Sequence, residues 1–303
     1  MVPKMENTFD VIIAGLGAMG SSSALHLAKN NKKVLGFDQF QPPHTLGSSH
    51  GQSRVIREAY YEHPLYVPIV QRAYELWFEL EKASGLELFL QTGGLMIGSA
   101  ESELYCGAKT SAEMHKLEHK LLTNEELKTR FPAFKLPDNI LAVWEPRAGV
   151  LFPERCIEAH LKEAEKYGAN LNYNEKILEW VADDAGVKVA TDKGEYTANQ
   201  LVFTSGAWIN NLVPELKMPL EVERQVLFWF DPAKKTDAFN PDKFPVYICE
   251  AEPGIMFYGF PDLGDGVKIA NHHRGGITTP ENLDRQVSDS EIEGISNIIR
   301  EYS

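Results

Sequence analysis

Three glycines between residues 15 and 20 are spaced as in a loop that binds the phosphates of a dinucleotide. The segment reads GLGAMG, which places Gly15, Gly17 and Gly20 in the pattern G-x-G-x-x-G. In this pattern the first glycine allows a tight turn, the second lets the backbone approach a pyrophosphate, and the third lets a helix pack closely on a strand. Further along the chain, the carboxylate of Asp38 is an acceptor for both hydroxyl groups of an adenosine ribose. These residues predict a dinucleotide site, and the charge of Asp38 disfavours NADP.

The elements that must position this loop are a strand, a helix and a second strand. Residues 9–14 (FDVIIA) form the nearly continuous apolar run of a strand that is buried on both faces of a parallel sheet. Residues 18–30 follow as a helix, whose N-terminus offers unpaired N–H groups to the phosphates. Residues 33–37 (KVLGF) predict the second strand, which ends at Asp38. This context favours a dinucleotide site over a purely structural glycine turn, but it does not separate NAD from FAD.

A polar segment after the second strand carries a cluster of hydrogen-bond donors. Residues 39–60 read QFQPPHTLGSSHGQSRVIREAY, where a simple NAD dehydrogenase would be expected to pass quickly to its next helix. His50, Arg54 and Arg57 lie in this segment, and on a helix the two arginines would share one face. The segment therefore predicts donors just beyond the ribose of the cofactor.

Together with GLGAMG and Asp38, this segment resembles the monomeric sarcosine oxidase family, which includes N-methyltryptophan oxidase and peroxisomal pipecolate/sarcosine oxidase. The resemblance is most specific in PPHTLGSSHGQSRVIREAY, and it continues through residues 88–99, 145–156, 203–208 and 257–273. It implies an α/β fold in which a Rossmann-like FAD-binding domain is interleaved with a mixed-sheet substrate domain. It also implies FAD as cofactor and the oxidation of a secondary or N-methyl amino acid by oxygen, which yields an imine or aldehyde, an amine and hydrogen peroxide.

The same resemblance implies which residues contact the cofactor. They come from the glycine loop, the end of the second strand, the polar segment and two later segments, of which the first, at Ile177, is expected near the adenine. The expected residues are Gly15, Leu16, Gly17, Ala18, Met19, Gly20, Asp38, Gln39, His44, Gly47, Ser48, His50, Arg54, Ile177, Ser205, Gly206 and Trp208.

The polar segment is also expected to contribute to catalysis and substrate binding. The resemblance implies that Arg57 binds the substrate carboxylate, which a guanidinium group contacts through two hydrogen bonds. It places Arg54 and His50 beside the flavin ring, where positive charge favours the reduced flavin. The alternatives are that Arg57 forms only a structural ion pair and that His50 caps backbone groups of its loop.

The strand-like segment around residue 268 contributes the remaining expected site residues. The resemblance implies that Lys268 promotes the reaction of the reduced flavin with oxygen, because a cation stabilises superoxide-like charge. The alternative is a solvent-exposed lysine on an edge strand. Tyr258 and His272 are expected to line the substrate pocket, with catalysis assigned to His272 as well. A shift of one residue in the match would assign His273 instead of His272.

Hydrophobic periodicity and turn residues predict the other elements. Residues 64–82 predict a helix whose core-facing side chains are Ile69, Ala73, Leu76, Trp77 and Leu80. Residues 88–98 predict two paired strands around Gly93 and Gly94. Further predicted elements are a short helix after a capping box of Thr123 and Glu126, a helix at 153–167, three strands within 171–208, a second sheet within 219–273 and a helix near 292–299.

The separated strand blocks predict two interleaved domains. We expect the FAD-binding domain at residues 8–85 and 150–215, and the substrate domain at 86–149 and 216–303. The family continues past residue 303 with a cysteine that bonds covalently to the flavin and a G-[FL]-S-G-H-G-F-K motif, and neither has a match here. We therefore expect a C-terminally truncated member. The alternatives are a truncated, non-catalytic FAD-fold protein and an NAD-dependent dehydrogenase.

Composition excludes several other classes of protein. The net charge is −13, with 43 acidic against 30 basic residues, so neither nucleic acid nor an anionic membrane is expected as a partner. Cys106, Cys156 and Cys249 show no CxxC spacing, so neither a disulfide framework nor a metal site is expected. No apolar run has the length of a membrane span, and the N-terminus lacks a signal peptide. These features predict a cytoplasmic protein, and the resemblance implies a small amino acid and oxygen as its partners.

Overall fold

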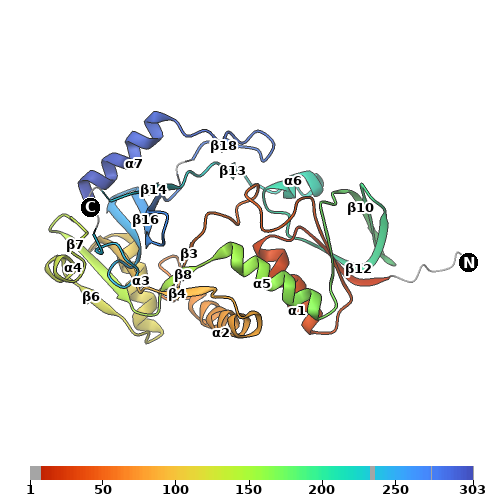
Figure 1. The fold of residues 1–303 in the computed structure, drawn as a ribbon, viewed down its shortest axis with the longest axis horizontal. Helices are drawn as coiled ribbons and strands as arrows, with labels where there is room; N and C mark the ends of the chain where they lie inside the picture. The colour runs from red at the N-terminus through yellow and green to blue at the C-terminus, as the bar shows by residue number, and fades with distance from the viewer. Residues whose placement is uncertain (1–7, 233–235, 274, 303) are drawn as a thin grey trace, which may run out of the picture.

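The computed structural model describes residues 8–232, 236–273 and 275–302. Figure 1 shows an elongated molecule with a sheet near each end and helices α1 (Ala18–Lys29) and α5 (Pro153–Lys166) beside the sheet nearer the N-terminus. This arrangement agrees with the α/β class that the sequence predicts.

One sheet contains the strands on either side of the glycine loop. Its order is β10-β11-β12-β1-β2-β9, and β1 pairs in parallel with both β12 and β2. The strands are β1 (Phe9–Ala14), β2 (Val34–Asp38), β9 (Asn170–Tyr173), β10 (Ile177–Asp183), β11 (Gly186–Thr191) and β12 (Glu195–Phe203). The predicted strand, helix and second strand are confirmed as β1, α1 and β2.

Helices cover one face of this six-stranded sheet. Side chains of β1 alternate between two cores, since Ile13 packs with α1 and α5 whereas Ile12 packs on the opposite face. Burial on both faces explains the continuous apolar run of this strand. Helix α5 begins with Pro153 in its first turn, as the sequence predicts.

Helix α2 (Tyr66–Ser84) packs beside α5 through a face that differs in part from the predicted one. Leu80 is buried as expected, but Ile69 is 66% exposed. Val67, Val70 and Tyr74 are buried in its place. Apolar residues lie on two sides of this helix, so periodicity alone did not identify the buried side.

The second large sheet has seven strands in the order β14-β17-β16-β15-β5-β7-β6. All of its pairings are antiparallel except that of β15 with β5. Its strands are β5 (Gly94–Ser99), β6 (Lys120–Leu122), β7 (Ile140–Glu145), β14 (Phe228–Phe230), β15 (Val246–Glu252), β16 (Ile255–Asp262) and β17 (Val267–Asn271). The predicted second sheet within 219–273 is confirmed, but it also includes three strands from earlier in the chain.

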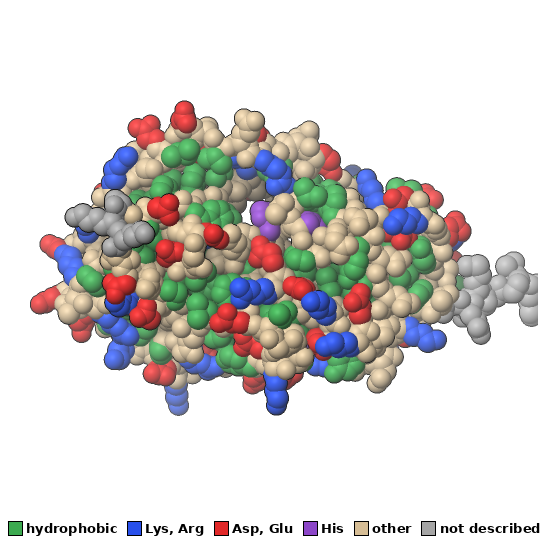
Figure 2. Space-filling view, in the orientation of Figure 1, with side chains coloured by type: hydrophobic (Ala, Val, Ile, Leu, Met, Phe, Trp, Pro, Cys, Tyr) green, Lys and Arg blue, Asp and Glu red, His purple; other side chains and the backbone are tan. Residues whose placement is uncertain are grey.

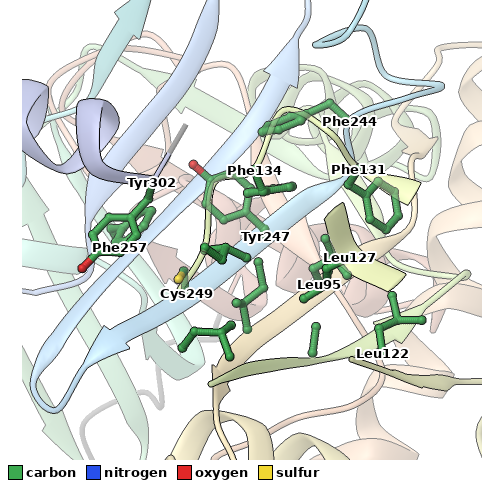
Figure 3. Close-up of a cluster of buried hydrophobic side chains, with 14 of the residues drawn as sticks. Leu95, Leu122, Leu127, Phe131, Phe134, Phe244, Tyr247, Cys249, Phe257 and Tyr302 are labelled. Carbon is green, nitrogen blue, oxygen red and sulfur yellow. The ribbon is translucent and has the colours of Figure 1, made fainter. Parts of the chain in front are cut away.

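A large aromatic core covers one face of the seven-stranded sheet. Figure 3 shows Phe134, Phe244 and Tyr247 together in this core, and the Phe134 and Phe244 rings stack with centroids 4.8 Å apart. Helix α4 (Asn124–Arg130), with the predicted capping box, and helix α7 (Asp289–Tyr302) pack against it through Leu127 and Tyr302. The core therefore joins segments that are far apart in the sequence.

A further, small sheet has three strands in the order β3-β8-β4. Its strands are β3 (Arg54–Ile56), β4 (Phe89–Gln91) and β8 (Gly149–Leu151). The prediction that β4 and β5 pair with each other is wrong, because β4 pairs with β8 while β5 pairs with β7 and β15. The chain passes from one sheet to the other at Gly93, which has a φ of 70°.

The remaining elements are short, apart from one helix. They are α3 (Glu103–Met114), η1 (Gly206–Trp208), α6 (Ile209–Leu212), η2 (Pro214–Leu216), β13 (Val222–Glu223) and β18 (Ile277–Thr278). The three cysteines are free, and only Cys106 is exposed. Among the described helices, none has the length and apolar character needed to cross a membrane.

Candidate functional site

A cavity of about 510 Å³ opens where β1, β2 and β12 end and α1 begins. Open α/β sheets bind ligands at this position, outside the carboxyl ends of parallel strands. The predicted cofactor residues that line it are Gly15, Gly17, Ala18, Met19, Asp38, Gln39, His44, Gly47, Ser48, Ile177, Ser205, Gly206 and Trp208. Sequence reasoning missed other lining residues, among them Phe40, Ser49, Glu175 and Thr204.

The three glycines differ in what a Cβ atom would meet at each position. A Cβ on Gly20 would lie 1.8 Å from the Gly15 carbonyl oxygen, so Gly20 permits the contact between helix and loop. Gly15 has a φ of 101°, and a Cβ there would lie 2.6 Å from the Thr204 carbonyl oxygen. At Gly17 the nearest atom is the Ser49 hydroxyl oxygen at 3.4 Å, so the backbone remains accessible from the cavity. The first turn of α1 carries no acidic residue, which fits an anionic group at this helix end.

Asp38 is buried at the end of β2 and lines the cavity. Its Oδ2 accepts a hydrogen bond from the Leu16 N–H at 2.8 Å, and its Oδ1 accepts one from the Phe40 N–H at 2.9 Å. The His44 Nε2 lies 3.6 Å from Oδ1. A carboxylate has about four acceptor positions, so Asp38 retains capacity for ribose hydroxyl groups. Leu16 itself is fully buried, and its backbone orients this carboxylate from outside the cavity lining.

The polar segment, residues 39–60, begins at this cavity and continues into β3. Arg54 of this segment lies in β3. Its guanidinium group donates hydrogen bonds to the Ser48 carbonyl oxygen at 2.5 Å and to the Ser53 carbonyl oxygen at 2.9 Å. These two bonds fix the loop between Ser48 and Ser53. The helical arrangement in which Arg54 and Arg57 would share one face is not formed, because β3 pairs with β8. His50 is half-buried, and burial followed by the charge of Arg54 lowers its pKa. Of these two side chains, Arg54 is therefore the one that carries positive charge.

Lys268 lies on β17, an interior strand between β14 and β16, and is only 2% exposed. Its Nζ donates to the Gly51 carbonyl oxygen at 2.6 Å, to the Ser53 carbonyl oxygen at 3.2 Å and to the Ser53 hydroxyl at 2.9 Å. Burial lowers the pKa of Lys268 to about 7, and the charge of Arg54 contributes to the decrease. The alternative of an exposed edge-strand lysine is wrong.

Arg57 directly follows β3 and forms an ion pair in this structure. Its Nη2 donates to both carboxylate oxygens of Glu62 at 3.0 Å, and its guanidinium group lies over the rings of Tyr60 and Tyr61. Its Nε is buried with no hydrogen-bond partner among the described residues. The predicted carboxylate-binding group is thus paired with a carboxylate of the chain itself, and it retains an unsatisfied donor.

Tyr61 connects Arg57 with the other expected pocket residues, although the sequence did not identify it. Its hydroxyl oxygen lies 3.4 Å from the His272 Nε2, and the His272 ring centroid lies 6.2 Å from that of Tyr258. His273 is exposed, so the geometry favours His272. Burial lowers the pKa of His272, and the charge of His273 contributes. Figure 2 shows histidine side chains beside a hollow near the middle of one face.

The chain is similar to known flavin enzymes over nearly its whole length. The family model described as FAD dependent oxidoreductase (DAO) matches residues 10–303. The monomeric sarcosine oxidase of Streptomyces avermitilis is 40% identical over 296 residues, which cover 97% of this chain and 77% of that protein. The N-methyl-L-tryptophan oxidase of Yersinia pestis is 33% identical over 269 residues, which cover 89% and 71%. The solved L-proline dehydrogenase of P. horikoshii has a similar fold, with a TM-score of 0.82, 21% identity and coverage of 98% and 77%.

Proposed function

The chain belongs to the FAD dependent oxidoreductase family and is a relative of the monomeric sarcosine oxidases, and from this premise we propose that it oxidises a secondary or N-methyl amino acid. FAD, rather than NAD, is the cofactor of this family, so the NAD-dependent dehydrogenase hypothesis is set aside. FAD, held by the residues that line the cavity at α1, would supply a two-electron acceptor for a hydride equivalent from the carbon beside the substrate nitrogen, with oxygen as the final acceptor and hydrogen peroxide as its product. Water then hydrolyses the released imine to an aldehyde and an amine.

The observation that supports an amino acid substrate is the state of Arg57. Its side chain is 13% exposed, its guanidinium group is already paired with a carboxylate, and its buried Nε has no hydrogen-bond partner within the described part of the chain. A substrate carboxylate that replaces Glu62 would satisfy two donors of this planar group at once. Glu62 is 39% exposed, so its release into solvent is inexpensive. We assign Arg57 to substrate binding on this basis.

His272 and Tyr258 are assigned to the substrate pocket next to Arg57. Because the pKa of His272 is lowered, its imidazole is neutral near pH 7 and able to accept or donate a hydrogen bond without adding charge. The Tyr61 hydroxyl lies within reach of this ring and orients it. These aromatic groups would exclude water from the carbon that is oxidised.

Lys268, Arg54 and His50 are assigned to the side of the site where oxygen reacts. With a pKa of about 7, Lys268 holds or releases a proton in the physiological range. Its contacts with Gly51 and Ser53 fix the ammonium group in a buried environment, where a cation stabilises developing negative charge more strongly than it does in water. Arg54 adds a permanent charge beside it.

We assign the cofactor to the cavity at α1, held by the lining residues named above together with Leu16, Gly20, His50 and Arg54. The division into a cofactor domain at residues 8–85 and 150–215 and a substrate domain at 86–149 and 216–303 belongs to the same proposal. A cytoplasmic location is also part of this proposal, as is the absence of nucleic-acid partners, and the net charge of −13 supports the latter.

The test begins with the visible absorption spectrum of the purified protein, followed by anaerobic titration with sarcosine, other N-methyl amino acids and glycine. We expect an oxidised-flavin spectrum that bleaches with N-methyl amino acids and not with glycine. Arg57→Met should raise the sarcosine concentration needed for bleaching by about 100-fold, as for loss of a charged hydrogen-bonded pair. The matched control is Arg72→Met, since Arg72 forms an exposed pair with Glu75 on α2. A flavin spectrum that no secondary amine bleaches would instead identify a non-catalytic FAD-fold protein.

A further inference from the structure

We propose that Glu145 is a positioning residue for substrate binding, because its carboxylate fixes the backbone of the two residues that directly follow Arg57. This inference rests on the proposed role of Arg57. Glu145 is the last residue of β7 and belongs to the seven-stranded sheet, whereas Arg57 follows the small strand β3. The contact therefore links the geometry of the substrate-binding group to a different sheet.

Both oxygens of the Glu145 carboxylate are used in this contact. Oε1 accepts a hydrogen bond from the Glu58 N–H at 2.7 Å, and Oε2 accepts one from the Ala59 N–H at 2.8 Å. Glu145 is 1% exposed and Ala59 is fully buried, so water does not compete for these bonds. A planar carboxylate that holds two consecutive N–H groups fixes both the position and the direction of the chain. The direction in which the Arg57 side chain leaves the backbone is thereby restrained.

The side chain of Glu58 is held by the same segment. Its Oε1 lies 3.0 Å from the Arg147 Nη1, and Glu58 is only 2% exposed. The Tyr74 hydroxyl donates to the Arg147 carbonyl oxygen at 2.9 Å, which fixes that residue in turn. The backbone of residues 58 and 59 is therefore hydrogen-bonded to Glu145, and the Glu58 side chain forms an ion pair with Arg147 two residues later. Glu62, at the other end of the loop, is exposed, and its carboxylate accepts hydrogen bonds from Arg57.

A purely electrostatic role of Glu145 makes the opposite prediction from a positioning role. Burial raises the pKa of Glu145, whereas the two backbone N–H groups and the nearby charge of Arg57 favour its carboxylate form. If charge alone mattered, removal of the carboxylate would strengthen the attraction between Arg57 and a substrate carboxylate. If positioning matters, the same removal releases the backbone and weakens binding. The sign of the change in affinity thus separates the two roles.

The test is Glu145→Gln in the FAD-loaded protein, measured with sarcosine as substrate and with acetate as a carboxylate ligand that is not oxidised. Glutamine keeps one acceptor oxygen but presents an NH₂ group to the second backbone N–H. We expect the KM for sarcosine and the dissociation constant of acetate, followed by flavin absorbance, to rise about tenfold, while kcat changes less than twofold. Oxidation of dimethylamine, which has no carboxylate, should not change.

The matched control is Glu81→Gln. The Glu81 Oε1 also accepts hydrogen bonds from two neighbouring N–H groups, those of Leu88 at 2.8 Å and Phe89 at 3.1 Å. Within the described residues, the hydrogen bonds and ring contacts of Arg57 are instead with Glu62, Tyr60 and Tyr61. Its acetate dissociation constant should equal that of the wild type. If the glutamine variant of Glu145 does not fold, Glu145→Asp, which is shorter by one methylene group, serves as the second variant, with the same expected rise.

Several outcomes would overturn the inference, and they differ from failure of the proposed function. Unchanged or tighter acetate binding in a folded Glu145 variant would exclude positioning. Equal weakening in the Glu81 variant would show a general loss of stability instead. By contrast, wild-type protein that binds no acetate, or an Arg57→Met variant that binds it normally, would refute the proposed function itself.

Discussion

Acid should destabilise this protein through His160, a buried imidazole in α5 that supports the helix of the glycine loop. His160 is 6% exposed, and its ring lies 5.2 Å from that of Trp77 on α2. Burial lowers the pKa of His160 to about 4, and the nearby His26 on α1 contributes to the decrease. His160 lines a small pocket between α1, α2 and α5. The histidine, lysine and glutamate side chains that line this pocket with it are His26, Lys29, Glu79 and Glu163. Protonation of His160 would therefore disrupt the packing of α5 against α1 and α2.

The size of the effect follows from the difference between the folded and unfolded pKa values. The ordinary pKa of a histidine side chain is 6.5, and burial lowers the pKa of His160 to about 4 in the folded protein. Because the folded pKa is the lower one, the unfolded state binds more protons, and stability from neutral His160 is present above pH 6.5 and lost as the pH falls towards 4. The free energy of unfolding should decrease by about 2 kcal/mol between pH 7 and pH 5 from this residue alone.

Urea unfolding at pH 7, 6 and 5, followed by tryptophan fluorescence, measures this loss. In His160→Gln the decrease between pH 7 and pH 5 should be smaller than in the wild type by about 2 kcal/mol. His63→Gln is the control, because His63 is exposed, and it should retain the full decrease. The same pH dependence in His160→Gln and the wild type would refute the assignment of this acid sensitivity to His160.

Three further predictions concern the site itself. Gly20→Ala should abolish flavin absorbance in the purified protein, since the added Cβ would lie 1.8 Å from the Gly15 carbonyl oxygen; retained absorbance would contradict the tight packing. Glu62→Gln should lower the KM for sarcosine several-fold, because the substrate no longer competes with a charged partner of Arg57, and steady-state kinetics at two salt concentrations will measure this. Lys268→Met should slow reoxidation of the reduced flavin at least tenfold in stopped-flow mixing with oxygen. In the wild type, this reoxidation should slow as the pH rises above about 7, because Lys268 then loses its proton. Equal reoxidation rates in both proteins would exclude a role of Lys268 in the reaction with oxygen.

The parts of the fold that the sequence predicted well depend on contacts between near neighbours. The glycine loop, α1 and β2 follow one another within thirty residues, so their order and the spacing of Gly15, Gly17 and Gly20 determine one local structure. The capping box of α4 is likewise complete within four residues, and both of its hydrogen bonds are present. Local patterns of this kind need no knowledge of the rest of the chain.

The parts that it did not predict depend on contacts between distant segments. Arg54 was compatible with a helix, and only pairing with β8, nearly a hundred residues later, makes its segment a strand. Lys268 in an apolar strand had two interpretations, and the position of β17 inside its sheet excludes that of an exposed edge-strand lysine. Glu145 gave no signal at all, because its role depends on the N–H groups of residues 58 and 59.

The pairing of β1 has a consequence for the order in which the protein folds during synthesis. Phe9 pairs with Ala198, and the Thr204 hydroxyl donates to the Gly15 carbonyl oxygen, 189 residues away in the chain. While the ribosome is still translating the middle of the chain, β1 has only β2 as a neighbour, and the nucleotide loop is incomplete. Such non-local pairing slows folding. Cofactor capture must therefore follow release of residues 195–204 from the ribosomal tunnel, which makes it a late step of maturation.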